Sequence, residues 1–367
     1  TWKNTVKVGS GLINNRFSFD GRLSRISSDG YVDRGASLLK SFFVSGAYHG
    51  NKDLLRLNVF SGAEKTYQSW NGIPESRLTN DLAGMNAYIE RNSLSPADAE
   101  NLLNSGRRYN SFTYDNQTDN YWQDHYQLIY ARQLSEKFTF NGALHYTKGK
   151  GYYEEYRVDN DLSAYGLNPV VIGGTTIEST DLIRRRWLDN DFYGATYAFN
   201  YQPNQKLNFT LGGAYNEYKG AHFGQVIWAQ YASNGSVDRH YYDNDGFKTD
   251  FNIYGKANYS PTESLSLFAD LQYRRVYYTI DGTENKLNTL AIFDKLNFFN
   301  PKVGATYFIN AESNIYGSFS VANKEPNRDD YADAAAGAFP KREHLKDIEL
   351  GYRFKNSQFN VGTNLYG

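Results

Sequence analysis

The chain has 367 residues, a formal net charge of −1 and no cysteine, so nothing favours nucleic-acid binding and a disulfide framework or thiolate metal site is excluded. Mean hydropathy is −0.66, and no apolar run approaches the ~20 residues that a membrane helix needs. A helical membrane protein is therefore excluded. A transmembrane β-barrel is allowed, because only alternate residues of its strands face lipid. The 16% aromatic content suits a membrane interface, a carbohydrate-binding surface or a β-sandwich.

Apolar and polar residues alternate with a period of two along most of the chain, which predicts β-strands. In KFTFNGALHY, residues 137–146, Phe138, Phe140 and Tyr146 share one face and polar residues share the other. The pattern recurs in residues 206–215, 251–259, 265–273, 347–354 and 359–366. The apolar face often ends in tyrosine, as in an aromatic girdle, and the polar face suits a wet lumen.

Connections between the predicted strands alternate between short and long. Short turns lie at residues 14–15, 50–53, 135–137, 202–205, 260–264, 310–313 and 355–358, and long polar excursions at 69–121, 159–183, 225–240, 281–295 and 325–344. This pattern predicts an all-β fold, an antiparallel transmembrane β-barrel segment of about fourteen strands with short periplasmic turns and long extracellular loops. Within the first excursion, Ser95 and Pro96 begin a predicted helix that ends at Gly106.

Five phrases carry a family resemblance. They are FDGRLSRISSDGYVDRG (19–35), DNYWQDHYQLIYARQL (119–134), LHYTKGKGYYEEYR (144–157), DGFKTDFNIYGKANY (245–259) and VANKEPNRDDY (321–331). Together they resemble the barrel of TonB-dependent outer-membrane receptors, especially the iron-siderophore type of Bacteroidetes. The last phrase is similar to a signature, Arg-Ala-Pro-Ser/Thr with a following acidic residue, that ends a barrel strand in many such receptors. Pro326 matches the proline, Lys324 stands in place of the arginine and Asn327 in place of the serine or threonine. Asp329 or Asp330 takes the acidic position, and Arg328 lies between Asn327 and these acids.

The resemblance implies a plugged barrel of 22 strands in the outer membrane of a Gram-negative bacterium. Residues 1–367 are then expected to be a partial barrel domain, without the plug and the C-terminal strands, that forms no functional pore alone. The implied function is uptake of a scarce bulky nutrient, most of all a ferric siderophore, energised by TonB. The implied partners are the TonB complex, acting through the plug, and outer-membrane lipid and lipopolysaccharide. No cofactor is expected.

Candidate ligand-binding residues lie near the predicted outer strand ends. Arg184, Arg185 and Arg186 can bind oxyanions in a bidentate manner, and Trp187 offers a flat face. We favour a second interpretation of this run, as a basic rim that binds lipopolysaccharide phosphates or pairs within its loop. Further candidates are Trp70, Tyr114, Trp122, His125, Tyr152, His222, Trp228 and Arg274.

The stretch SFSVANKEPNRDDY, residues 318–331, begins as a strand and turns polar around Pro326. Because proline has no amide to donate, we expect strand pairing to end there. Lys324 and Arg328 are expected to pair with the neighbouring Glu325, Asp329 and Asp330. The motif is thus interpreted as a strand boundary in preference to a ligand site.

Other classes of function stay open or are disfavoured. No nucleophile elbow, metalloprotease motif or phosphate-binding loop is present, so we expect no enzyme and no metal site. Asp243, Asn244 and Asp245 lack the spacing of a calcium loop and are interpreted as a strand-end turn. The remaining alternatives are a glycan importer, a haem receptor that uses His125 or His222, a passive porin and a soluble β-sandwich lectin.

Overall fold

The computed structural model describes residues 1–232, 234, 239–334 and 338–367. It contains one antiparallel sheet of 14 strands, in which each strand pairs with the next along the chain. The exception is a separate two-stranded hairpin, β7–β8, between β6 and β9. The sheet strands are β1 (Trp2–Gly9), β2 (Phe17–Ser28), β3 (Ser37–His49), β4 (Asp53–Tyr67), β5 (Thr118–Ser135), β6 (Phe138–Asp161), β9 (Ser179–Asn204), β10 (Leu207–Ala229), β11 (His240–Thr262), β12 (Leu265–Thr283), β13 (Thr289–Phe308), β14 (Ser313–Lys324), β15 (Glu343–Lys355) and β16 (Asn360–Tyr366), and the hairpin is β7 (Val170–Ile172) and β8 (Thr175–Ile177). The predicted strand count is confirmed.

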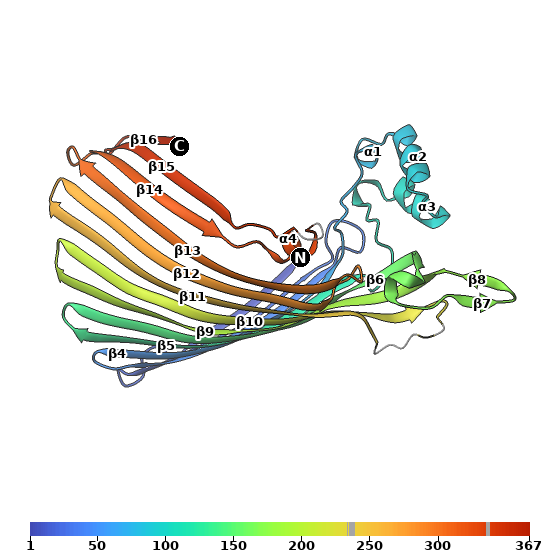
Figure 1. Ribbon diagram of the computed structural model, residues 1–367, viewed down its shortest axis with the longest axis horizontal. Helices are drawn as coiled ribbons and strands as arrows, with labels where there is room; N and C mark the ends of the chain where they lie inside the picture. Colours follow the sequence, from blue (N-terminus) through green and yellow to red (C-terminus); the bar gives the residue numbers. More distant parts are fainter. Residues whose placement is uncertain (233, 235–238, 335–337) are drawn as a thin grey trace.

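The sheet curves strongly, and its connections segregate by length (Figure 1). The short turns lie together at one end, and the helices and the β7–β8 hairpin lie at the other. One predicted excursion, 281–295, is wrong: Thr283 pairs with Thr289, which leaves only a tight connection between β12 and β13. Most of the predicted excursion belongs to strands, because β12 continues to Thr283 and β13 already begins at Thr289.

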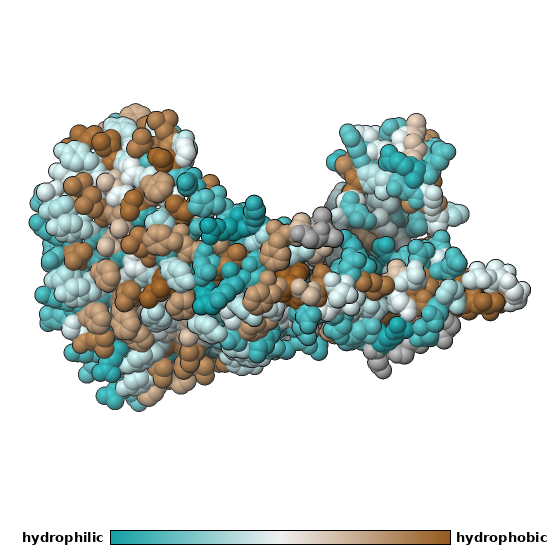
Figure 2. Space-filling view, in the orientation of Figure 1, coloured by the Kyte–Doolittle hydropathy of each residue, from teal (hydrophilic) through white to brown (hydrophobic). Residues whose placement is uncertain are grey.

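Exposed apolar side chains are concentrated on one half of the sheet. Figure 2 shows brown residues gathered over the half next to the short turns, and teal residues toward the loop end. Tyr215, for example, remains 46% exposed, and Leu128 and Phe251 are exposed as well. The sandwich alternative is wrong, because it requires these faces to be buried between two sheets. Among the described residues, no helix combines the length and the apolar character needed to cross a membrane.

A small helical unit follows β4. It contains α1 (Glu75–Leu78), α2 (Leu82–Arg91), α3 (Pro96–Asn104) and the 3₁₀ turn η1 (Gly106–Arg108), and a second 3₁₀ turn, η2 (Leu162–Tyr165), lies after β6. The predicted helix is confirmed as α3, whose cap Ser95 accepts a hydrogen bond from the Asp98 amide at 3.2 Å. The sequence did not reveal α1 and α2. Their apolar residues are buried only because Met85, Leu102 and Tyr109 form a common core.

The helical unit is tied to the loop between β2 and β3. The Arg34 guanidinium donates to the carbonyl oxygens of Phe112 and Asn110, at 2.8 and 3.1 Å. The Asn110 amide donates in turn to the carbonyl oxygens of Asp33 and Gln68, both at 3.0 Å. The unit is therefore anchored through backbone groups that lie far apart in sequence.

Replacing Leu102 by alanine is expected to unfold the helical unit locally. Leu102 is completely buried, and truncation of a buried leucine costs about 2–5 kcal/mol. Amide hydrogen exchange in residues 82–104 should accelerate, while exchange in the strands stays unchanged because they do not pack on this core. Leu82→Ala, at a 61% exposed position of the same unit, is the control. Equal effects of the two changes would contradict the assignment of this core.

Candidate ligand-binding site

The signature-like stretch ends a strand and starts a short helix. β14 stops at Lys324, and Pro326 is buried. This confirms the predicted strand boundary. Helix α4 (Arg328–Ala332) follows, with Asn327 and Asp330 in a reciprocal capping box. Asn327 Oδ1 accepts from the Asp330 amide at 3.0 Å, and Asp330 Oδ2 accepts from the Asn327 amide at 2.7 Å.

The predicted ion pairs within this stretch are wrong. Lys324 pairs instead with Glu343 at 3.0 Å, because the two lie opposite each other in β14 and β15. Arg328 donates to Asn244 Oδ1 on β11 at 2.6 Å. The side chains of these sequence neighbours point in different directions, because residues of a strand alternate between its two faces and a helix begins directly after the strand. They therefore contact different elements.

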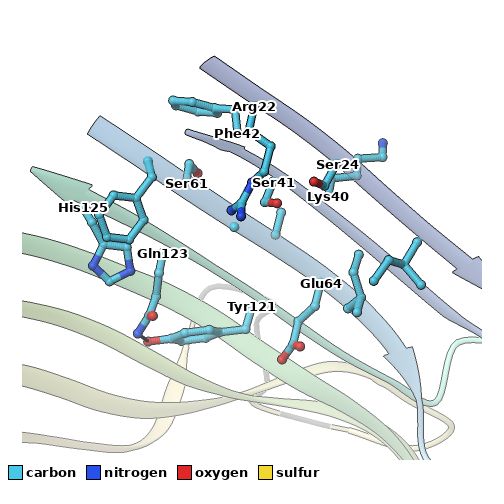
Figure 3. A pocket seen from close by; sticks show the side chains of 15 residues that line it. Arg22, Ser24, Lys40, Ser41, Phe42, Ser61, Glu64, Tyr121, Gln123 and His125 are labelled. Carbon is cyan, nitrogen blue, oxygen red and sulfur yellow. Dashed lines mark hydrogen bonds between the residues drawn. The ribbon is translucent and has the colours of Figure 1, made fainter. Parts of the chain in front are cut away.

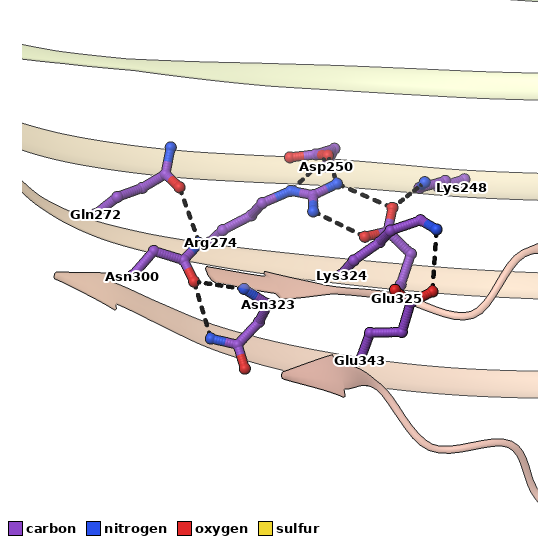
Figure 4. A network of polar contacts seen from close by, with 9 residues as sticks. All are labelled: Lys248, Asp250, Gln272, Arg274, Asn300, Asn323, Lys324, Glu325 and Glu343. Atoms are coloured by element: carbon purple, nitrogen blue, oxygen red, sulfur yellow. Dashed lines mark hydrogen bonds and ion pairs between the residues drawn. The ribbon is translucent and has the colours of Figure 1, made fainter. Parts of the chain in front are cut away.

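Glu325, which lies between β14 and α4, instead contacts side chains of the neighbouring strands (Figure 4). Its carboxylate accepts from Arg274 on β12 at 2.8 and 2.9 Å, and also from Lys248 on β11. Arg274 donates as well to Asp250 at 2.9 Å. Burial acts to raise the pKa of Glu325, but hydrogen bonds from Arg274 and Lys248 outweigh it and lower the pKa to about 2. The base of α4 is thus held by a charged contact with two strands.

Amide groups continue this contact toward β13. Asn300 donates to Gln272 at 3.0 Å, and Asn323 donates to Asn300 at 2.9 Å (Figure 4). Tyr331 on α4 donates to Asp294 at 2.6 Å. The segment after β14 therefore lies against the wall formed by β11, β12 and β13.

A cavity of about 360 Å³ lies between α4 and the wall. Its lining comes from β5, β6, β9, β10, β11, the β12–β13 connection and α4. The lining residues are Asp119, Tyr121, Gly151, Tyr152, Tyr153, Arg186, Trp187, Leu188, His222, Tyr242, Asn244, Glu284, Asn285, Arg328, Asp329 and Ala332. Four of the predicted ligand-binding residues, Tyr152, Arg186, Trp187 and His222, are brought together here with two residues of the signature.

Neutral partners hold the two arginines of the cavity. Arg186 donates to the hydroxyls of Tyr153 and Tyr242, at 2.6 and 3.4 Å. Its guanidinium also lies 5.6 Å from the centroid of each ring. Arg328 is held by Asn244. Neither arginine forms an ion pair with another described residue, so both can bind the acceptor groups of a ligand.

The other two arginines of the predicted basic run are paired with glutamates. Arg184 pairs with Glu155 at 2.6 Å, and Arg185 pairs with Glu154 at 2.8 Å. The run therefore does not act as one anion-facing cluster. Arg185 lies on the opposite face of β9 from its two neighbours, because successive strand residues alternate. Arg184 shares the face of Arg186, but its charge is neutralised by Glu155. Trp187 donates to Gln225 at 2.8 Å and contacts the Tyr152 ring at 4.4 Å.

Tyr121 lines both this cavity and a second one. A Cβ at Gly151 would lie 2.5 Å from the Tyr121 ring, so glycine there lets the ring lie against the strand. The second cavity, of about 530 Å³, lies over β2–β5 and is also lined by Tyr121 (Figure 3). There His125 stacks on Phe60 at 4.4 Å and contacts Thr147 Oγ1 at 2.9 Å. His125 and His222 thus line different cavities.

The remaining candidates lie outside both cavities. Trp70 lies edge-on against Tyr153 at 5.4 Å, and Trp228 stacks on Tyr156 at 6.4 Å. Tyr114 donates to Glu154 at 2.8 Å, and burial followed by this contact raises the pKa of Tyr114 to about 12. Trp122 pairs in register with Ala63 and Lys150. Arg274 donates hydrogen bonds to Glu325, which holds the base of α4.

Sequence reasoning missed several residues of the cavity, namely Asp119, Tyr242, Asn244 and Glu284. The predicted strand-end turn at Asp243, Asn244 and Asp245 is wrong, because these residues lie within β11 and pair with both β10 and β12. No sequence pattern distinguishes these residues from other polar residues that face the lumen. Within the described residues, no three His, Cys, Asp or Glu side chains gather as metal ligands would.

Comparison with solved structures shows the same fold. The ferric-catecholate import receptor Fiu from E. coli K12 (open form) matches with a TM-score of 0.67 and 14% identity, covering 99% of this chain and 58% of that chain. The ferric citrate transporter FecA in its unliganded form matches with a TM-score of 0.70 and 11% identity, and the match covers 99% of this chain and 48% of that chain. The siderophore receptor PiuA from Acinetobacter baumannii matches with a TM-score of 0.69 and 12% identity, and the match covers 99% of this chain and 54% of that chain. The chain thus spans about half the length of these structures.

No curated protein matches the chain. The family model described as "TonB dependent receptor-like, beta-barrel" matches residues 13–367. The names of the matched structures are those of transport receptors, not of enzymes. By its sequence over residues 13–367, and in agreement with its fold, the chain belongs to the TonB-dependent receptor-like β-barrel family.

Proposed function

We propose that this chain is the barrel part of an outer-membrane receptor that takes up a ferric siderophore in a TonB-dependent manner. The observation that carries the proposal is the cavity under α4, where Arg186 and Arg328 have neutral partners and lie among tyrosine rings. Guanidinium groups bind the oxygen atoms of an iron chelate, and aromatic rings contact its apolar surface. Family membership and structures named as siderophore receptors support the same function.

The action of such a receptor is non-covalent. The concave wall and α4 bind the chelate from the extracellular side, and the cavity excludes part of the surrounding water. TonB, acting through a plug domain, supplies the energy for release into the periplasm. The bilayer faces the apolar half of the sheet, and lipopolysaccharide surrounds the strand ends above it. The Bacteroidetes subtype stays a prediction.

Uptake of iron-55 siderophores by cells is the test of this function. The full-length receptor that carries this chain should support uptake that stops when TonB is deleted. Uptake that continues without TonB would indicate a passive porin. Growth on a polysaccharide or on haem, in place of iron-siderophore uptake, would contradict the proposal and favour the glycan or haem alternative.

A further inference from the structure

The cavity under α4 carries charges of both signs. Arg186 and Arg328 contribute two positive charges, and Asp119, Glu284 and Asp329 contribute three negative charges. The formal balance is therefore −1. None of the five forms an ion pair with another described residue, although the Glu284 carboxylate accepts a hydrogen bond from the Lys286 amide at 2.7 Å. All five line the cavity, so a ligand there would meet charges of both signs.

The neighbouring charges do not alter this balance. Lys248 and Arg274 are neutralised by Asp250 and Glu325, in the contact that holds the base of α4. Lys286 lies near Glu284 and Asp329, but it pairs with Asp333 at 3.0 Å, so this pair adds no net charge. The other groups close to the arginines are neutral: the hydroxyls of Tyr153 and Tyr242 and the amide of Asn244. This part of the wall therefore offers no surplus of positive charge.

Such a cavity discriminates between siderophores by their charge. A ferric tris-catecholate is a trianion and needs an excess of cations around it, and carboxylates repel it in a partly desolvated site. A ferric tris-hydroxamate is neutral. Its carbonyl and hydroxamate oxygens can accept from the arginines, while amide or ammonium groups on its backbone can donate to the carboxylates.

We propose that the receptor selects ferric siderophores of near-zero net charge, of the hydroxamate class, and discriminates against trianionic catecholates. This inference rests on the proposed function and specifies its ligand. Asp119, Glu284 and Asp329 are the specificity-determining residues, because they remove the excess of positive charge that Arg186 and Arg328 would otherwise create.

Competition binding tests the proposal on outer-membrane vesicles that contain the full-length receptor. The probes are ferrichrome, a neutral tris-hydroxamate chelate, and ferric enterobactin, a trianionic tris-catecholate. Ferrichrome is expected to bind at least about 10-fold more tightly, since one charge contact in such a site corresponds to roughly that factor. Equal or tighter binding of ferric enterobactin overturns the inference and leaves the proposed function intact. Failure of both chelates, and of other ferric siderophores, overturns both.

Variants of the carboxylates test the mechanism of selection. The double variant Glu284→Gln, Asp329→Asn changes the balance from −1 to +1. The ratio of affinities is expected to shift toward ferric enterobactin by about 10-fold or more. Asp119→Asn alone should shift the ratio in the same direction, which keeps the test valid if the double variant is poorly folded. Asp98→Asn, on the helical unit, is the matched control. An unchanged ratio in both cavity variants overturns the assignment.

Discussion

Replacing Arg186 and Arg328 together by alanine is expected to weaken binding of the ferric siderophore about 100-fold, because truncation of central charged contacts costs several kcal/mol. Both guanidinium groups line the cavity and are held by neutral groups, so their charge is available to the ligand. The loss should appear as a higher Kd in vesicles that contain the full-length receptor. Each single variant should lose less than the double variant, since the remaining arginine still binds.

The matched control is Arg91→Ala, at an exposed position of α2 outside the cavity. It removes the same charge and should leave the Kd unchanged. Comparable weakening by Arg91→Ala would show that the long-range field of the protein attracts the chelate. Unchanged binding by the double variant would mean that the ligand site lies elsewhere on the receptor.

Replacing Glu325 by glutamine is expected to release α4 from the wall. The side chain of Glu325 is 14% exposed and pairs with Arg274 and Lys248. Removing one partner of a buried charged contact leaves the others unpaired, which costs about 2–4 kcal/mol. Hydrogen exchange of the amides of residues 328–332 should accelerate by about 100-fold, since 1.4 kcal/mol corresponds to a factor of ten.

The exposed pair at the base of the same segment provides the control. Glu343 is 66% exposed and pairs with Lys324, which is 64% exposed. Glu343→Gln should change exchange in α4 by less than about 0.5 kcal/mol, because solvent screens such pairs. Equal changes of hydrogen exchange in the two glutamine variants would show that the contact of Glu325 does not hold α4 against the wall.

Acid should have the same effect as the Glu325 substitution. The pKa of Glu325 is lowered to about 2 in the folded protein, below its ordinary value of 4.5. The stabilisation is therefore fully present above about pH 4.5 and is lost as the pH falls through 2. A fluorophore on A334C, in a chain without other cysteines, should report release in this range. In the Glu325→Gln background this contribution to the pH dependence should be absent, and its persistence there would assign it to another group.

The location of strands could be predicted because their signal is local. Side chains of a strand alternate between two environments, so residues such as Phe138, Phe140 and Tyr146 mark a strand without knowledge of its neighbours. Connection lengths then order the strands into one meandering sheet. The predicted helix was likewise local, since Ser95 and Pro96 form a helix start from side-chain and backbone chemistry alone.

The cavity could not be predicted because its contacts are distant in sequence. Arg328 meets Asn244 across 84 positions, and Arg274 meets Glu325 across 51. The charged residues 324–330 were expected to pair with one another, but solvated neighbours gain little from such pairing. Instead, Lys324 pairs with Glu343 on β15, Glu325 contacts the wall, and Asp330 caps α4.

The sequence alone determined the fold class, the family, the segregation of short and long connections, and the end of β14 before Pro326. These features depend on periodicity and on backbone chemistry, which every short segment carries within itself. Only the tertiary structure decided which arginine of residues 184–186 faces the cavity and which acids lie opposite it. That choice depends on the register of β6, β9 and β10, on the curvature of the sheet and on the return of α4 over its concave face. All three are set by pairing between distant strands, so no single segment encodes them.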